Sequence, residues 1–148
     1  KAAGIHRYML SFAELPTDDK ELFELDPQAE PVYKIESKKG IKFATKYWKG
    51  NGRLMAARGD WYVELDKPHH IIKAAETLVQ RDPKAIAASR IFPSLAESYM
   101  PSCNDIGDVD SLIRMGYKTL MLGDDVCQKR ESVISALNLL GEMPESYK

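Results

Sequence analysis

The sequence predicts an α/β fold, a partial TIM-type (β/α) barrel of about five parallel strands with flanking helices. Three observations lead to this prediction. Short apolar runs alternate with longer amphipathic stretches, the unit repeats about every 25 to 30 residues, and no linker or low-complexity tract interrupts the chain. Since 148 residues suffice for one ordinary core, we expect residues 1–148 to form a single domain.

The expected elements follow one another in regular order. The expected strands are short and apolar, and they cover residues 8–12, 31–36, 53–57, 85–88 and 119–122. The expected helices cover residues 17–25, 40–47, 69–80, 105–115 and 132–140. Thr17 is the expected N-cap of the first helix, because acidic residues follow it. Gly116 suits a C-terminal cap, and residues 119–122 are expected to be fully buried.

Composition excludes several classes of protein. The formal charge of −1, from 21 basic and 22 acidic side chains, lacks the basic excess that is typical of nucleic-acid binding. No apolar run approaches the roughly 20 residues of a membrane span. Cys103 and Cys127 lie far apart, without metal-ligand spacing, and no signal peptide is evident at the N-terminus. We therefore expect a cytoplasmic protein with free thiols that binds neither nucleic acid nor membrane.

Charged and hydroxyl side chains follow the ends of the expected strands. In parallel β/α folds these ends open on one face, where reactive residues gather. The residues expected to converge there are Lys34, Glu36, Asp60, Ser89, Arg90, Asp124 and Asp125.

Glu36 and Asp60 are candidate ligands of one Mg²⁺ or Mn²⁺ ion. Both follow neighbouring strands, and carboxylate oxygens suit these hard cations, which take few protein ligands. Strand alternation places Lys34 on the same side as Glu36, while Ile35 faces the helices. A structural salt bridge or solvated charges at the rim would give the same pattern, so spacing alone leaves both interpretations open.

Five collinear segments resemble the pyruvate kinase family. The family motifs K-I-E, M-V-A-R-G-D-L-G-V-E, T-A-T-Q-M-L-E-S-M, P-T-R-A-E-V-S-D-V-A-N-A-V and V-M-L-S-G-E-T are similar, in this order, to residues 34–36, 55–64, 86–95, 101–113 and 120–126. Residues 10–12, Leu-Ser-Phe, also resemble the family's A-S-F-V-R strand. The resemblance covers nearly the whole chain, with a short deletion between Asp60 and Ser89. It implies strands four to eight of the family's catalytic barrel.

The resemblance also implies roles for individual residues. Lys34 would be the catalytic lysine, and Glu36 and Asp60 would bind the divalent metal. The backbone amides of Gly59 and Asp60 would receive the substrate carboxylate at the start of a short helix. Ser89 stands where the family has threonine and would relay a proton, although a hydroxyl that bonds its own turn is an equal alternative.

Two aromatic residues depart from the family pattern. Trp61 and Tyr62 stand where the family has Leu-Gly. We expect them to crowd the mouth of the site or to pack on a partner. Substrate access would then differ from that of the family.

The resemblance predicts an incomplete pyruvate kinase-like barrel. The first three strands, the lid, the nucleotide-binding part and the C-terminal regulatory domain are absent, and K⁺ would bind only if the missing strands were present. We expect completion by missing chain or by another subunit in an oligomer. The complete phosphotransferase would bind Mg²⁺ and transfer phosphoryl between phosphoenolpyruvate and ADP, whereas this fragment alone would be inactive. Alternatives are a non-catalytic scaffold or binding subunit, or a metal-dependent lyase or aldolase acting on a pyruvate enolate.

Overall fold

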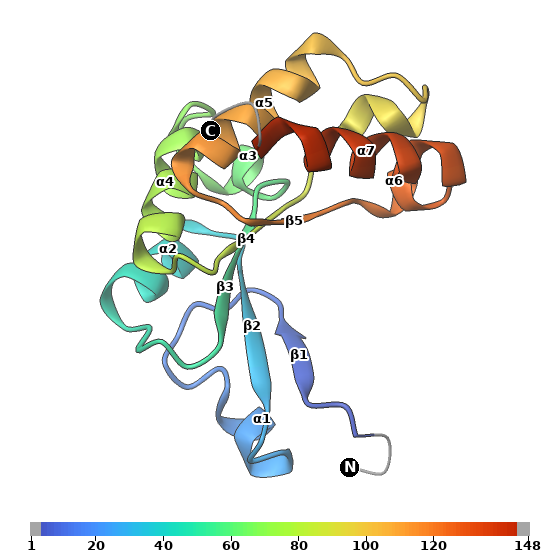
Figure 1. Cartoon of the computed structure of the whole chain (residues 1–148). Coiled ribbons are helices and arrows are strands. Elements are labelled where there is room, and N and C mark those ends of the chain that lie inside the picture. The colour runs from blue at the N-terminus through green and yellow to red at the C-terminus, as the bar shows by residue number, and fades with distance from the viewer. Residues whose placement is uncertain (1–3, 145–148) are drawn as a thin grey trace.

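A parallel five-stranded sheet forms the centre of the molecule. The structure is a computed structural model that describes residues 4–144, so residues 1–3 and 145–148 of the predicted domain lie outside it. The strand order is β1-β2-β3-β4-β5, and every neighbouring pair is parallel. The strands are β1 (Arg7–Leu10), β2 (Glu30–Ile35), β3 (Arg53–Ala57), β4 (Ile86–Ala88) and β5 (Thr119–Met121). At least one helix joins each strand to the next, so the predicted α/β class is confirmed and the sheet is consistent with a partial barrel (Figure 1).

The helices largely match the predicted ranges. They are α1 (Lys20–Leu25), α2 (Lys38–Lys46), α3 (Trp61–Glu64), α4 (His70–Arg81), η1 (Pro93–Ala96), α5 (Cys103–Met115), α6 (Asp124–Cys127) and α7 (Arg130–Glu142). The resemblance implied a short helix after Asp60, where α3 lies. The short η1 and α6 were not among the expected helices, because a single turn is too short to show helical periodicity.

Helix caps explain where several helices begin and end. The Ser37 hydroxyl accepts a hydrogen bond from the Gly40 amide at the start of α2, and the Ser102 hydroxyl does the same for Asp105 in α5. Gly116 ends α5 with a φ of 110°, as predicted. The Thr17 cap is wrong, because α1 begins at Lys20 after Asp19.

The preceding turn accounts for the late start of α1. The Asp18 carboxylate accepts hydrogen bonds from the Glu14 and Leu15 amides, at 2.8 and 2.9 Å. The side chain therefore holds a local turn instead of capping a helix.

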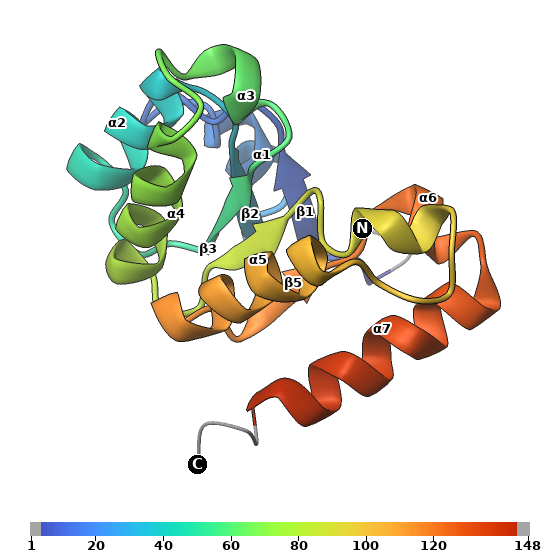
Figure 2. The same cartoon turned by 90° about the horizontal axis from the view of Figure 1, so that it is seen from above.

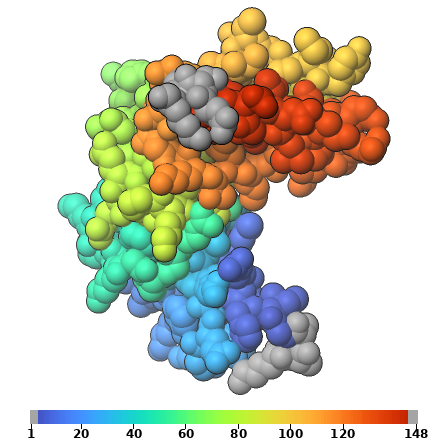
Figure 3. All heavy atoms as spheres, in the orientation of Figure 1, coloured from blue at the N-terminus to red at the C-terminus, as the bar shows by residue number. Residues whose placement is uncertain are grey.

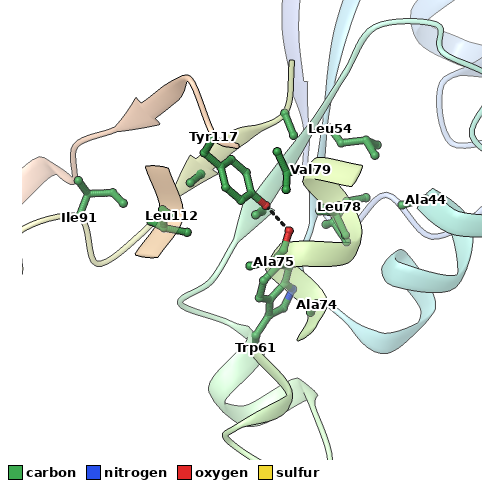
Figure 4. Packing of buried hydrophobic residues seen from close by; sticks show 14 of the residues in the cluster. Ala44, Leu54, Trp61, Ala74, Ala75, Leu78, Val79, Ile91, Leu112 and Tyr117 are labelled. Carbon is green, nitrogen blue, oxygen red and sulfur yellow. Dashed lines mark hydrogen bonds between the residues drawn. The ribbon is translucent and has the colours of Figure 1, made fainter. Parts of the chain in front are cut away.

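The main core lies between the outer face of the sheet and helices α2, α4 and α5, which cover that face in both views (Figures 1 and 2). Leu54 and Leu78 are fully buried there, and the Tyr117 hydroxyl donates a 2.8 Å hydrogen bond to the Ala75 carbonyl (Figure 4). Burial of such side chains provides most of the stability of an amphipathic helix.

The inner face of the sheet carries a smaller apolar cluster. It consists of Met55, Ile86 and Ala88, with Val32 and Met121 partly buried beside them. The β1 and α6–α7 ends of the chain stand apart in the space-filling view, and the molecule is hollowed between them (Figure 3). The prediction that residues 119–122 are fully buried is wrong, because all four are only partly buried. Within residues 4–144, none of the helices has the length and apolar character to cross a membrane.

Candidate functional site

The end of β2 carries an ion pair with unequal burial. Lys34 Nζ lies 2.8 Å from Glu36 Oε1, and the side chains of the two residues are 26% and 5% exposed. Ile35, between them, is fully buried in the core beside the helices. Lys34 and Glu36 therefore share the inner face of the sheet, as strand alternation predicts. The buried Glu36 carboxylate is therefore paired through one oxygen with the Lys34 ammonium group, which is itself partly open to solvent.

The end of β1 completes the surroundings of this pair. The Phe12 amide donates a 2.5 Å hydrogen bond to Glu36 Oε2, and Lys34 Nζ donates a 3.2 Å hydrogen bond to the Ser11 hydroxyl. Because a carboxylate oxygen has two lone pairs, each oxygen of Glu36 keeps one for another partner.

The turn after β3 presents unused polar groups. Within the described residues, the Asp60 carboxylate makes no hydrogen bond or ion pair, and the Gly59 and Asp60 amides donate to no acceptor. Asp60 immediately precedes α3 and does not cap it with its side chain. This turn can therefore offer one carboxylate and two amide donors to a ligand.

The Ser89 hydroxyl lies against the same turn. A methyl group at Gly59 would stand 3.3 Å from Ser89 Cβ and 3.4 Å from Ser89 Oγ. This close approach follows from strand pairing, because Ala57 of β3 lies opposite Ala88 of β4. The structure thus brings Gly59 and Ser89 together from two neighbouring strands.

The segment that carries Ser89 has an unusual backbone. Ser89, Arg90 and Phe92 have φ values of 65°, 55° and 48°, in the left-handed region that residues with a Cβ atom rarely adopt. Each such residue costs roughly 1–3 kcal/mol and persists where neighbouring contacts hold it.

A buried arginine supplies such contacts to two of these residues, Ser89 and Arg90. Arg58 is 6% exposed, and its two terminal nitrogens each lie 2.8 Å from a carboxylate oxygen of Asp108 on α5. Arg58 Nη2 also donates to the Ser89 and Arg90 carbonyls, at 3.1 and 3.2 Å. One guanidinium group therefore joins the turn after β3, the segment after β4 and helix α5.

The two aromatic residues after Asp60 have different surroundings. Trp61 is fully buried and packs below Ala74 and Ala75 of α4, so its expected place at the mouth of the site is wrong (Figure 4). Tyr62 is 48% exposed, and the guanidinium carbon of Arg90 lies 3.8 Å from its ring centroid. The departure from the family pattern thus adds a core residue and a cation–π contact between the two loops.

The remaining predicted rim residues do not join this group. Asp124 and Asp125 are exposed on α6, and within the described residues their carboxylates make no side-chain hydrogen bond or ion pair. No cluster of three or more His, Cys, Asp or Glu side chains suited to a metal ion occurs in residues 4–144. A cation at Glu36 and Asp60 would thus need ligands from substrate or water.

Sequence reasoning missed the residues that hold the site together. Asp108 lies 50 positions after Arg58, and the Phe12 amide acts through its backbone. The one signal for Arg58 was its place in the Arg-Gly-Asp motif. No local pattern connects it with α5, since contacts between distant elements leave no periodic trace.

Comparison with known proteins supports the resemblance over most of the chain. The sequence is 28% identical over 134 residues to the pyruvate kinase of Thermoplasma acidophilum, a match that covers 84% of this chain. It is 26% identical over 103 residues to the pyruvate kinase of Borreliella burgdorferi, covering 68% of this chain. No family model matches. The matches span only 24% and 22% of these two relatives. The chain is therefore a partial, divergent segment that is similar to pyruvate kinase.

Proposed function

We propose that this chain is part of the catalytic barrel of a pyruvate kinase-like phosphotransferase and that it binds phosphoenolpyruvate or pyruvate together with Mg²⁺. The observation that carries the proposal is the arrangement at the carboxyl edge of the sheet. Lys34 and Glu36 meet at the end of β2, and Gly59 and Ser89 meet where β3 and β4 end. Parallel β/α folds place their active sites at this edge.

Glu36 and Asp60 are the proposed ligands of the divalent metal. Glu36 keeps one lone pair on each oxygen, and the Asp60 carboxylate makes no contact within the described residues that would compete with a cation. Two carboxylates fit Mg²⁺, which is commonly held by one or two carboxylates, with substrate and water as the other ligands. Bound Mg²⁺ would supply positive charge beside the oxygens of the substrate.

Lys34 is the proposed catalytic lysine. Its ammonium group is held by Glu36 and Ser11 but remains 26% exposed, so it can also face a ligand. A cation that is fixed before the reaction stabilises negative charge as it develops on a transferring phosphoryl group. The complete protein would transfer phosphoryl between phosphoenolpyruvate and ADP.

The turn after β3 and the Ser89 hydroxyl would act on the organic part of the substrate. Among the described residues, the Gly59 and Asp60 amides have no acceptor, so they are free to donate to a substrate carboxylate. Ser89 Oγ, which lies against Gly59, would hold or pass a proton at the carbon next to the carbonyl.

The sheet supports the proposal that the chain forms part of a larger barrel. In the described residues, β1 and β5 pair on one side only. Since closure of a barrel pairs every strand on both sides, further strands from the same protein or from another subunit would complete it. The active state is therefore proposed to need more chain than these 148 residues.

A titration of Mn²⁺ in the presence of oxalate, which resembles a pyruvate enolate, tests the proposed site. Oxalate should strengthen Mn²⁺ binding to the wild-type protein, and Glu36→Gln should weaken it by about tenfold or more, which corresponds to ~1.4 kcal/mol. The matched control is Glu30→Gln, because Glu30 is exposed at the other end of β2 and pairs with Arg7. Equal Mn²⁺ affinity with and without oxalate in the wild type would contradict the proposal.

A non-catalytic binding subunit is the second candidate. The Arg90–Tyr62 contact favours it, because it ties the two loops beside Gly59 and Ser89 and would limit their movement around a substrate. A catalytic site should, once the barrel is completed, exchange the methyl protons of pyruvate for deuterium in the presence of Mg²⁺. Carboxylate-dependent Mn²⁺ binding without this exchange would favour the binding subunit.

A further inference from the structure

The segment 89–92 has a strained backbone and is bonded to one buried side chain. Three of its four residues have left-handed φ values, and none of the three is glycine. Arg58 contacts two carbonyls of this segment, at Ser89 and Arg90. Because strained backbone persists only where the surrounding structure determines it, these two contacts help to hold the conformation, together with the burial of Ile91 and Phe92.

Arg58 is itself fixed by Asp108. The guanidinium group makes two parallel 2.8 Å contacts to the Asp108 carboxylate, the geometry that best restricts the orientation of an arginine. The side chain of Arg58 is only 7% exposed, whereas that of Asp108 is 44% exposed. Helix α5, far along the chain, therefore determines where the guanidinium group points.

We propose that Arg58 and Asp108 are positioning residues that keep the Ser89 hydroxyl against the Gly59 turn. The pair acts through the Ser89 and Arg90 carbonyls. Loss of the Asp108 charge frees the guanidinium group to turn away, and the segment then relaxes toward right-handed or extended φ values. Ser89 Oγ moves away from Gly59 as a result. The catalytic part of this inference rests on the proposed function.

The test variant is Asp108→Asn, which keeps the size of the side chain but removes its charge. The control is Asp110→Asn on the same helix, where the carboxylate pairs with the exposed Arg114. In NMR spectra, the ¹³Cα, carbonyl and amide signals of residues 89–92 should shift in Asp108→Asn, because the contacts to the Ser89 and Arg90 carbonyls are lost. They should stay unchanged in Asp110→Asn. Unchanged signals in Asp108→Asn would overturn the inference.

A second measurement separates positioning from a general loss of structure. In the completed barrel, deuterium exchange of pyruvate in Mg²⁺ should fall by about tenfold or more in Asp108→Asn, while Mn²⁺ affinity with oxalate changes by less than about twofold. Equal losses in both measurements would show that the pair acts only on stability and would overturn the inference.

The double variant provides the sharpest test. If Asp108 acts through Ser89, adding Asp108→Asn to Ser89→Ala should lower proton exchange no further than Ser89→Ala alone. Additive losses would contradict the proposed route. If the wild type shows neither exchange nor oxalate-dependent binding, the proposed function fails, and the NMR comparison alone decides whether the pair positions Ser89.

Discussion

Two ion pairs at the carboxyl edge of the sheet are built in opposite ways. In Lys34–Glu36 the acid is buried and the base is partly open, whereas in Arg58–Asp108 the base is buried and the acid is half exposed. A buried carboxylate can lose its charge by taking up a proton, but a guanidinium group cannot lose its charge. The arginine pair therefore suits a fixed structural role, and the lysine pair suits one that a ligand can alter.

The largest expected effect comes from removing the acid of the arginine pair. Asp108→Ala should lower the free energy of unfolding by about 3 kcal/mol, near the lower end of the range for broken buried pairs, since solvent screens the half-exposed carboxylate. Urea unfolding measures this loss. A loss below about 1 kcal/mol would mean that water reaches Arg58 and that the contrast between the pairs is wrong.

Removing the base of the lysine pair should cost less. Lys34→Met should lower the free energy of unfolding by about 1–2 kcal/mol, because Glu36 keeps the hydrogen bond from the Phe12 amide. Urea unfolding measures this loss.

Metal binding tests whether a ligand can alter the Lys34–Glu36 pair. If Glu36 binds a divalent ion, Lys34→Met should retain or strengthen Mn²⁺ affinity, because a competing cation is removed from Glu36 Oε1. In the completed barrel, deuterium exchange of pyruvate should nevertheless be lost. A fall in Mn²⁺ affinity comparable with that of Glu36→Gln would indicate that Lys34–Glu36 is a structural unit only.

The contact between Arg90 and Tyr62 should contribute less than either ion pair. Tyr62→Leu removes the ring below the guanidinium group and should lower the free energy of unfolding by about 0.5–1 kcal/mol, the range for an exposed cation–π contact. Thermal unfolding measures the change. The control is Tyr99→Leu, because Tyr99 is also exposed and lies outside this contact.

A third pair, His6–Asp26 at the amino end of the sheet, should affect the free energy of unfolding only at acidic pH. The hydrogen bond from His6, followed by those from the Gln28 amide and Tyr8, holds the pKa of Asp26 below its ordinary value of 3.8, although burial opposes this. A carboxyl group whose pKa is lower in the folded state stabilises the protein at pH values above its unfolded-state pKa. This gain disappears as the pH falls through the folded-state pKa. Asp26→Asn should therefore flatten the loss of stability below about pH 4. If urea unfolding showed the same loss of stability below about pH 4 in Asp26→Asn as in the wild type, the prediction would be contradicted.

Most of the fold could be predicted from the sequence because its signals are local. The strand Arg53–Ala57 has the predicted bounds, and α4 and α5 differ from prediction by only one or two residues. Short apolar strands, helical periodicity and the Gly116 cap are each visible within a few residues. The single-turn helices and the late start of α1 could not be predicted in this way, since neighbouring side chains decide them.

The proposed site was only partly predictable. Strand alternation placed Lys34 and Glu36 on one face, and the structure has them in contact. It could not show that Ser11 and Phe12 complete their surroundings. The comparison with the family pattern led us to expect Trp61 at the mouth of the site or on a partner, although this side chain fills the core beside α4. A residue next to a motif can face either side of a turn, and only packing decides which.

By itself, the sequence determined the class of fold, the order of its strands and the edge at which the charged residues lie, because alternation and helical period are properties of neighbouring residues. Only the tertiary structure decided that Arg58 reaches Asp108 and two carbonyls of the Ser89 segment. The physical reason is that three elements distant in the sequence must pack before one guanidinium group can join them. The left-handed conformation of Ser89 depends on that packing.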